Sequence, residues 1–155
     1  MKVILGADQD GLRLKDVLKD HIESHYDYEV QDVSPEGSKN FVESAKAIAQ
    51  ALQEDEDAYG IAVDKIGAGS FMAASKHKGV VVAEISDERS AFMTRQHNNA
   101  RMITLGSDIV ADAMAKSITD HFLQAEYDGG RHQVRVDMLD DLLSLIHIWR
   151  CRRST

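Results

Sequence analysis

Short β-branched runs that alternate with amphipathic helical stretches restrict the fold of this 155-residue chain more than any other feature. Five runs are expected to form strands: KVILG at 2–6, YEVQDV at 28–33, YGIAV at 59–63, GVVVAEI at 79–85 and RMITLG at 101–106. Between them, apolar residues recur at helical spacing, most clearly from Ile109 to Phe122. This order predicts an α/β fold, a Rossmann-like three-layer α/β/α sandwich with a five-stranded parallel sheet.

The composition of the chain is typical of one globular domain, and its charge argues against a nucleic-acid-binding protein. With 43% apolar residues and one proline, residues 1–143 are expected to form one domain without a linker. A formal charge of −8 disfavours binding to a nucleic-acid backbone. No apolar run approaches the roughly 18 residues of a membrane span and no signal peptide is recognisable, so we expect a cytoplasmic protein. The single cysteine, Cys151, excludes an intrachain disulfide and a cysteine-based metal site.

The end of the sequence changes character after an acidic helical stretch. Residues 144–155, SLIHIWRCRRST, contain a tryptophan and three arginines, and we interpret them as a vector-derived tail, with a native extension as the alternative. The preceding helix, expected near Gln133 to Leu143, carries an apolar stripe after all five strands have been used. It therefore packs either on another subunit, which predicts an oligomer, or back on its own domain.

Polar residues and glycines follow the predicted strands at the edge where doubly wound sheets bind ligands. Asp8 follows the first strand, and a turn with Gly67, Gly69 and Ser70 follows the third. The dinucleotide fingerprint is absent, because GADQDG has Asp8 where the second glycine would stand, and a carboxylate repels a pyrophosphate. We expect neither a nucleotide cofactor nor a metal.

Two basic stretches supply further candidate residues. RQHNNAR places His97 and Asn98 before the fifth strand, and GGRHQVR places Arg131 and Arg135 on one face of a helix. Arginines at this spacing can hold a phosphate through charge-assisted, bidentate hydrogen bonds. The alternatives are surface ion pairs for the arginines, a hydrogen-bonded loop position for His97 and a turn cap for Asp8.

The stretches GADQDG, GAGSFMAASK, RQHNNAR and AEYDGGRHQVRV together resemble the ribose-5-phosphate isomerase B family over about residues 1–143. YDGGRHQVRV is the most specific of them. The resemblance implies a phosphosugar aldose–ketose isomerase without metal or nucleotide, whose active sites form between two subunits.

The resemblance also assigns roles to individual residues. Ring opening of the sugar falls to His97, and phosphate binding falls to Arg131 and Arg135. Backbone N–H groups of the glycine turn would stabilise the enediolate intermediate. The residues that the resemblance places at the substrate are Asp8, Gly67, Gly69, Ser70, Asn98, Arg131, His132 and Arg135.

The turn after the third strand departs from the family pattern. Most members have a cysteine as C–H base where this chain has Asp64 and a threonine at the position of Ile66, and another branch has a glutamate at Ser70. A histidine is replaced by Gln9, which cannot shuttle a proton. The half containing His97 is intact. This asymmetry fits the A-type subunit of a branch that interconverts galactose 6-phosphate and tagatose 6-phosphate, with the base supplied by a homologous B-type partner.

Two other hypotheses remain open from the sequence. The chain could bind a sugar phosphate without turnover, or it could be a homodimeric pentose-phosphate isomerase with Asp64 as the base. The second is disfavoured because the charge of Lys65 lowers the basicity of Asp64. A carboxylate also displaces the reacting atom by roughly 1 Å relative to a cysteine, which can cost about 10²-fold in rate.

Overall fold

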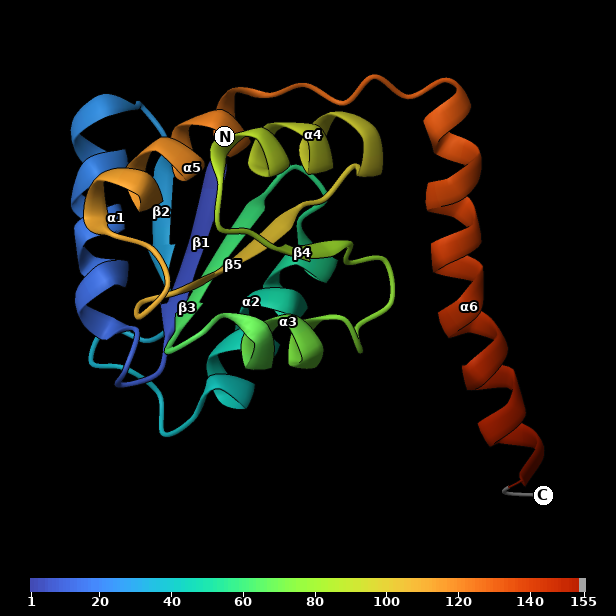
Figure 1. Cartoon of the computed structure of the whole chain (residues 1–155). Coiled ribbons are helices and arrows are strands. Elements are labelled where there is room, and N and C mark those ends of the chain that lie inside the picture. Colours follow the sequence, from blue (N-terminus) through green and yellow to red (C-terminus); the bar gives the residue numbers. More distant parts are fainter. Residues whose placement is uncertain (154–155) are drawn as a thin grey trace.

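The computed structural model describes the backbone of residues 1–153 and the side chains of residues 1–143. The side chains of the tail expected at 144–155 lie outside the described residues. The elements run in the order β1 (Lys2–Ala7), α1 (Leu12–His25), β2 (Glu29–Asp32), α2 (Phe41–Glu54), β3 (Tyr59–Asp64), α3 (Ala68–Ala74), β4 (Val82–Glu84), α4 (Glu88–Asn98), β5 (Met102–Gly106), α5 (Asp112–Gln124) and α6 (Arg131–Arg153) (Figure 1).

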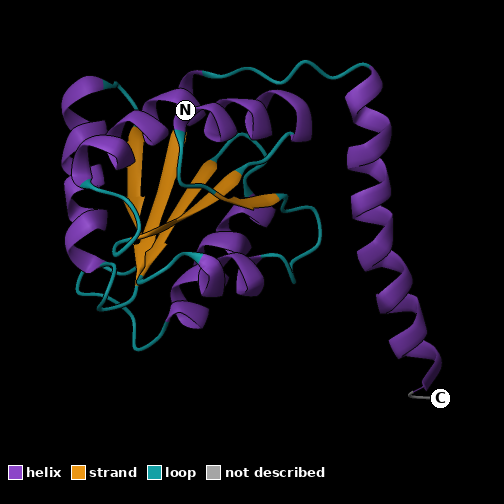
Figure 2. Cartoon of the chain, viewed as in Figure 1, coloured by secondary structure: helices purple, strands orange, loops and turns teal. Residues whose placement is uncertain are grey.

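The five strands form one sheet in the order β2-β1-β3-β5-β4, and every pairing is parallel (Figure 2). Helices α1, α4 and α5 cover one face, and α2 and α3 cover the other. The predicted three-layer sandwich is confirmed. Because the strands run in the same direction, their carboxyl ends lie together at one edge, which is the lower edge in Figure 1.

Alternate residues of the strands enter two separate apolar cores, as the two-residue period of a strand requires. Val3 and Leu5 pack under α1 and α5, whereas Ile4 between them packs under α2. Ile61 and Ala62 of β3 divide in the same way. Burial on both faces explains why these strands appear in the sequence as nearly continuous apolar runs.

The edge strand β4 is shorter than the sequence predicts. A strand was expected over 79–85, but only Val82–Glu84 is extended and paired. Gly79 has φ +75°, a left-handed conformation that turns the chain before the strand begins. β4 lies at the edge of the sheet and pairs with β5 alone, over three residues.

A buried lysine and a half-buried arginine brace the sandwich, and neither was predicted from the sequence. The Nζ of Lys15 on α1 is buried and donates to Asp32 Oδ2 at 2.7 Å and to the carbonyl of Ser34 at 2.9 Å. Arg101, just before β5, donates to the carbonyls of Leu52 and Asp55 at the end of α2. Both cations therefore fix helix positions relative to the sheet.

Helix α6 stands beside the sandwich rather than on its sheet, and its first turn lies near the end of α4 (Figure 1). It begins at Arg131, two residues before the predicted start, and continues past the predicted end. Val134, Met138 and Leu142 on this helix are 63%, 62% and 57% exposed. The sheet of the same chain therefore leaves much of the apolar stripe uncovered. Among the described residues, no helix combines the length and apolar character needed to cross a bilayer.

Candidate active site

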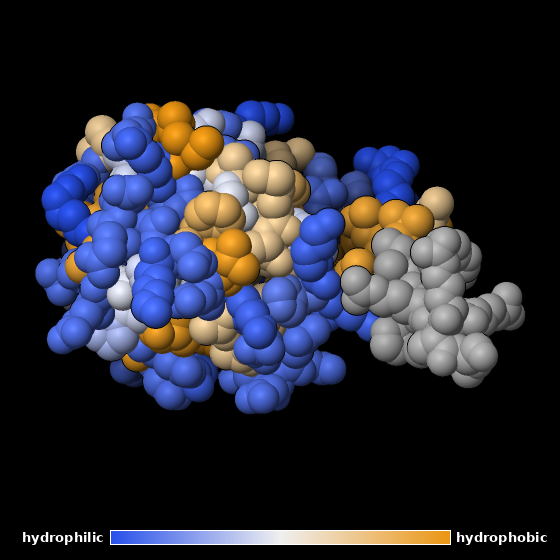
Figure 3. Space-filling view, turned by 90° about the horizontal axis from the view of Figure 1, so that it is seen from below, coloured by the Kyte–Doolittle hydropathy of each residue, from blue (hydrophilic) through white to orange (hydrophobic). Residues whose placement is uncertain are grey.

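The carboxyl edge of the sheet brings together Asp8, at the end of β1, and the turn between β3 and α3. This is the edge seen from below in Figure 3, where apolar side chains gather near the middle of the face. Ile66 and Ile109 are 51% and 57% exposed and follow β3 and β5, respectively. The predicted group Asp8, Gly67, Gly69 and Ser70 is thus assembled at one edge.

The side chain of Asp64 binds backbone N–H groups at the start of α3, whose N-cap residue is Gly67. Asp64 is only 3% exposed. One oxygen accepts hydrogen bonds from the backbone N–H groups of Ile66, at 2.9 Å, and Gly67, and the other accepts from the N–H of Ser70 at 2.8 Å. Two of the N–H groups that could face an anionic intermediate, those of Gly67 and Ser70, therefore already bind a carboxylate of the same chain.

The glycines of the turn are required by its tight geometry. Gly67 has φ +84°, and its carbonyl accepts a hydrogen bond from Thr104 Oγ1 at 2.8 Å. A Cβ on Gly69 would stand 2.8 Å from the ring of Phe41. The Oγ of Ser70 is buried without a hydrogen-bond partner among the described residues. The turn is therefore closely packed around the carboxylate of Asp64.

Asp8 is buried beside this turn. Burial raises the pKa of Asp8, and the nearby charges of Asp64 and Asp10 act in the same direction, whereas the N–H of Gly11 donates to Asp8 and opposes them. Asp8 does cap a turn, as one alternative held. Gln9 donates to the carbonyls of Glu36 and Gly37 at 2.7 and 3.2 Å, so it fastens a loop.

The second group of predicted residues lies at the opposite, amino edge. Helix α4 runs back against the strands, so its last residues, His97 and Asn98, stand near the start of β5. The N–H of Asp128 donates to the carbonyl of Gln96 at 3.0 Å and attaches the linker before α6 to this end of α4. His97 therefore lies on a helix rather than in the loop that one alternative required.

His97 and His132 form a stacked pair of imidazole rings. Their centroids are 4.2 Å apart and their planes differ by 7°. Partial burial lowers the pKa of His132, and His97, Arg131 and Arg135 add to the effect, while Asp128 opposes it. Asp128 lies in the stretch YDGGRHQVRV but was not among the residues predicted for the site.

Arg131 and Arg135 are exposed on the first turns of α6, and both act electrostatically on His132. Neither arginine forms an ion pair with a carboxylate among the side chains that the structure describes. The surface ion-pair alternative therefore gains no support. The two arginines therefore form a cationic surface beside the histidines, and such a surface is suited to a phosphate.

The two groups cannot act on one small molecule within a single chain. A strand of five or six residues spans roughly 17 to 20 Å, whereas acid–base contacts need about 3 Å. His97 lies at the amino edge, and Asp8 and Gly67 lie at the carboxyl edge. Within one chain, the two groups of predicted residues therefore lie too far apart to form a single small-molecule site.

His97, Asp128 and His132 also have the composition of a metal site, since their nitrogen and oxygen atoms lie within 4.8 Å of one another. Because the lone pairs of an imidazole lie in the plane of its ring, two stacked, nearly parallel rings cannot direct them toward one metal ion. Arg131 and Arg135 add positive charge next to the group. This arrangement fits an acid–base cluster better than a chelate.

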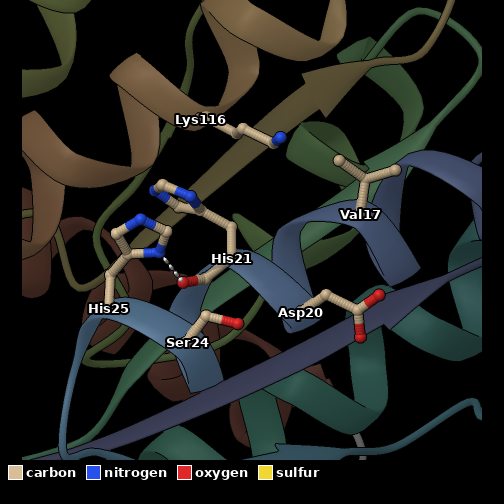
Figure 4. A pocket seen from close by; sticks show the side chains of 6 residues that line it. All are labelled: Val17, Asp20, His21, Ser24, His25 and Lys116. Carbon is tan, nitrogen blue, oxygen red and sulfur yellow. Dashed lines mark hydrogen bonds between the residues drawn. The ribbon is translucent and has the colours of Figure 1, made fainter.

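A separate polar pocket of about 290 Å³ lies between α1 and α5 (Figure 4). Val17, Asp20, His21, Ser24 and His25 come from α1, and Lys116 comes from α5. A ring nitrogen of His25 is hydrogen-bonded to the carbonyl of His21 at 2.9 Å. The predicted site residues do not line this pocket.

The sequence model of the Ribose/Galactose Isomerase family matches residues 3–139. Galactose-6-phosphate isomerase subunit LacA of Staphylococcus epidermidis is 52% identical over 142 residues, which are 92% of this chain and 99% of that protein. Galactose-6-phosphate isomerase subunit LacA 2 of Streptococcus pyogenes is 54% identical over the same shares of the two chains.

Solved structures of ribose-5-phosphate isomerase B have the same fold. The Clostridium thermocellum structure superposes with a TM-score of 0.90 at 32% identity and covers 94% of this chain and 99% of its own. The Mycoplasma genitalium structure with bound ribulose-5-phosphate has a TM-score of 0.86 at 32% identity, and the match covers 91% and 95% of the two chains.

Proposed function

Because this chain belongs to the ribose/galactose isomerase family, we propose that it is one subunit of a galactose-6-phosphate isomerase, which interconverts galactose 6-phosphate and tagatose 6-phosphate. The observation that carries the proposal is the division of the site: His97 and the two arginines lie at one edge of the sheet, and the glycine turn lies at the other. A homologous B-type partner supplies the catalytic turn that faces His97.

His97 opens the sugar ring in this scheme. The C1–O5 bond breaks, its electron pair takes a proton from the imidazolium of His97, and the O1–H proton passes to water as the carbonyl forms. Arg131 and Arg135 hold the phosphate, and Asn98 contacts the sugar. The open-chain sugar is then positioned for the second step.

The base of the second step comes from the partner. A cysteine thiolate of the B-type subunit removes the proton from C2, an enediolate forms, and the proton is returned to C1. N–H groups of the partner's turn stabilise the enediolate charge. The equivalent turn of this chain cannot do so in the same way, since Asp64 already accepts the N–H groups of Gly67 and Ser70.

The test is isomerase activity in complexes of verified composition. We expect turnover only when this chain is mixed with a B-type homologue. His97→Asn should lower kcat of the mixed enzyme by about 10²- to 10⁴-fold, the usual contribution of a general acid, while Asp64→Ala should leave it nearly intact.

Two other outcomes would each contradict the proposal. Turnover by this chain alone that disappears in Asp64→Ala would identify a homodimeric enzyme with Asp64 as the base. Sugar-phosphate binding without turnover in any mixture would identify a non-catalytic subunit. Assembly of each variant should be verified by light scattering, because a His97 variant that fails to fold would mimic a catalytic loss.

A further inference from the structure

The stacked pair His97–His132 connects two helices, α4 and α6. His97 is in the last turn of α4, and His132 is in the first turn of α6. Near-parallel rings at 4.2 Å are in van der Waals contact over much of their faces. His97 therefore cannot rotate about its Cβ–Cγ bond without displacing His132.

The linker holds His132 in this position. The N–H of Asp128 donates to Gln96, and the N–H of His132 donates to the carbonyl of Gly129 at 3.1 Å. Gly129 and Gly130 have φ of +61° and +56°, which bends the chain sharply into α6. The hydroxyl of Tyr127 donates to Gln133 Oε1 at 2.7 Å and closes the turn. His132 is thus placed by a constrained turn.

The charges that act on His132 come from three parts of the chain: His97 on α4, Asp128 in the linker, and Arg131 and Arg135 on α6. Two imidazolium ions in stacked contact repel each other, and both arginines oppose a second positive charge. The carboxylate of Asp128 favours one charge in the pair. The surroundings therefore support only one positive charge on the two rings.

We propose that His132 is a positioning residue that acts through His97, fixing the plane of that imidazole and leaving the positive charge of the pair on His97 for ring opening. This inference rests on the proposed function, in which His97 is the acid. A positioning role of His132 differs from a direct contact with the phosphate in its expected effect. The positioning role affects the chemical step, whereas a phosphate contact would mainly affect substrate binding.

The first test uses the chain without a partner, and it remains informative if the isomerase proposal fails. Imidazole resonances of His132 are followed against pH by NMR in the wild type and in His97→Phe, which keeps a flat ring but removes the charge. We expect His132 to titrate at higher pH in His97→Phe. His25→Phe, in the pocket of Figure 4, is the matched control and should leave His132 unchanged. An unaltered His132 titration in His97→Phe overturns the coupling.

The second test uses the mixed enzyme. His132→Ala should lower kcat by about 10²-fold with little change in KM, as a displacement of the reacting group by about 1 Å can do. His132→Phe should recover most of kcat, since it restores the stacked ring. In the wild type, protonation of His132 at acid pH places a second positive charge next to His97 and should lower kcat. His132→Phe cannot be protonated, so the fall in kcat should move to lower pH in this variant.

Two results would count against the role of His132. A raised KM with an unchanged kcat in His132→Ala would make it a phosphate ligand. A pH profile of His132→Phe that coincides with the wild type would reduce it to a packing residue. Absence of turnover in the unmodified mixed enzyme would contradict the proposed function and leave the NMR test to decide the coupling.

Discussion

The backbone N–H of Ser70 donates a 2.8 Å hydrogen bond to Asp64 Oδ2, so a buried carboxylate joins the end of β3 to the first turn of α3. The same side chain also accepts N–H groups from Ile66 and Gly67. The carboxylate of Asp64 thus occupies three backbone N–H groups of the turn. Asp64 should therefore matter for folding more than for turnover.

Replacing Asp64 with alanine should lower the free energy of unfolding by about 3 kcal/mol, because it leaves several buried N–H groups without an acceptor. Asp87→Ala is the matched control, since the side chain of Asp87 caps α4 and accepts a hydrogen bond from the N–H of Ser90. That variant should lose about 1 kcal/mol. Urea unfolding measures both, and equal losses would contradict the role assigned to Asp64 at the start of α3.

Asp8→Asn should remove a pH dependence of stability. The pKa of Asp8 is raised in the folded chain, mainly by burial, so the native state binds more protons than the unfolded state between the two pKa values. Wild-type stability therefore falls as pH rises through that interval, starting near the ordinary value of 3.8. Asparagine can still accept the N–H of Gly11 but does not titrate.

The measurement is the difference in unfolding free energy between Asp8→Asn and the wild type, taken from about pH 3 to about pH 7. The asparagine variant should gain relative stability toward neutral pH. A difference that stays constant over the whole range would show that Asp8 titrates alike in both states.

Arg131→Ala or Arg135→Ala should weaken sugar-phosphate binding in the mixed enzyme by about 2 kcal/mol, or roughly 30-fold, because each change removes a charge-assisted contact. Arg13→Ala is the control, since Arg13 pairs with Asp112 at 2.9 Å on the outside of the sandwich. Calorimetric titration measures binding. Unchanged affinity, KM and kcat in both variants would return the arginines to a surface role.

The purified chain alone should be at least a dimer, because the apolar stripe of α6 remains exposed in the single chain. Met138→Glu combined with Leu142→Glu should reduce the assembly, whereas Asp141→Ala on the same helix should not. Removing residues 144–155 should leave it unchanged if the tail is foreign. Light scattering at micromolar concentration decides, and a stable wild-type monomer would contradict the prediction.

The layered fold could be predicted because strand and helix periods are properties of the local sequence. The runs at 2–6, 59–63 and 101–106 became strands within one residue at either end. The run at 79–85 was too long in the prediction, because its pairing depends on a single neighbour and on the backbone angle of Gly79. Edge strands depend on tertiary context that alternation does not encode.

The residues of the candidate site could be predicted from the sequence, but their contacts with one another could not. The sequence pointed to His97 and Arg131, yet the stacking of His97 on His132 depends on how α6 leaves its linker. The three hydrogen bonds to Asp64 were also not predicted, because Asp64 lies three residues before the N-cap residue Gly67 and so gives no ordinary N-cap signal. Lys15 offered no local signal either, since a buried cation depends on partners far along the chain.

The strand order β2-β1-β3-β5-β4 also determines when the sheet can close during translation. β4 is synthesised before β5, but β5 is its only neighbour in the described sheet. β3 also pairs with β5 on the side that does not face β1, so that side has no partner until β5 has been made. A nascent chain that ends before Met102 can therefore complete no more than the β2-β1-β3 portion. While residues 65–101 are being made, the unpaired edge of β3 is open to mispairing with another emerging chain, and a chaperone would protect it best in that interval.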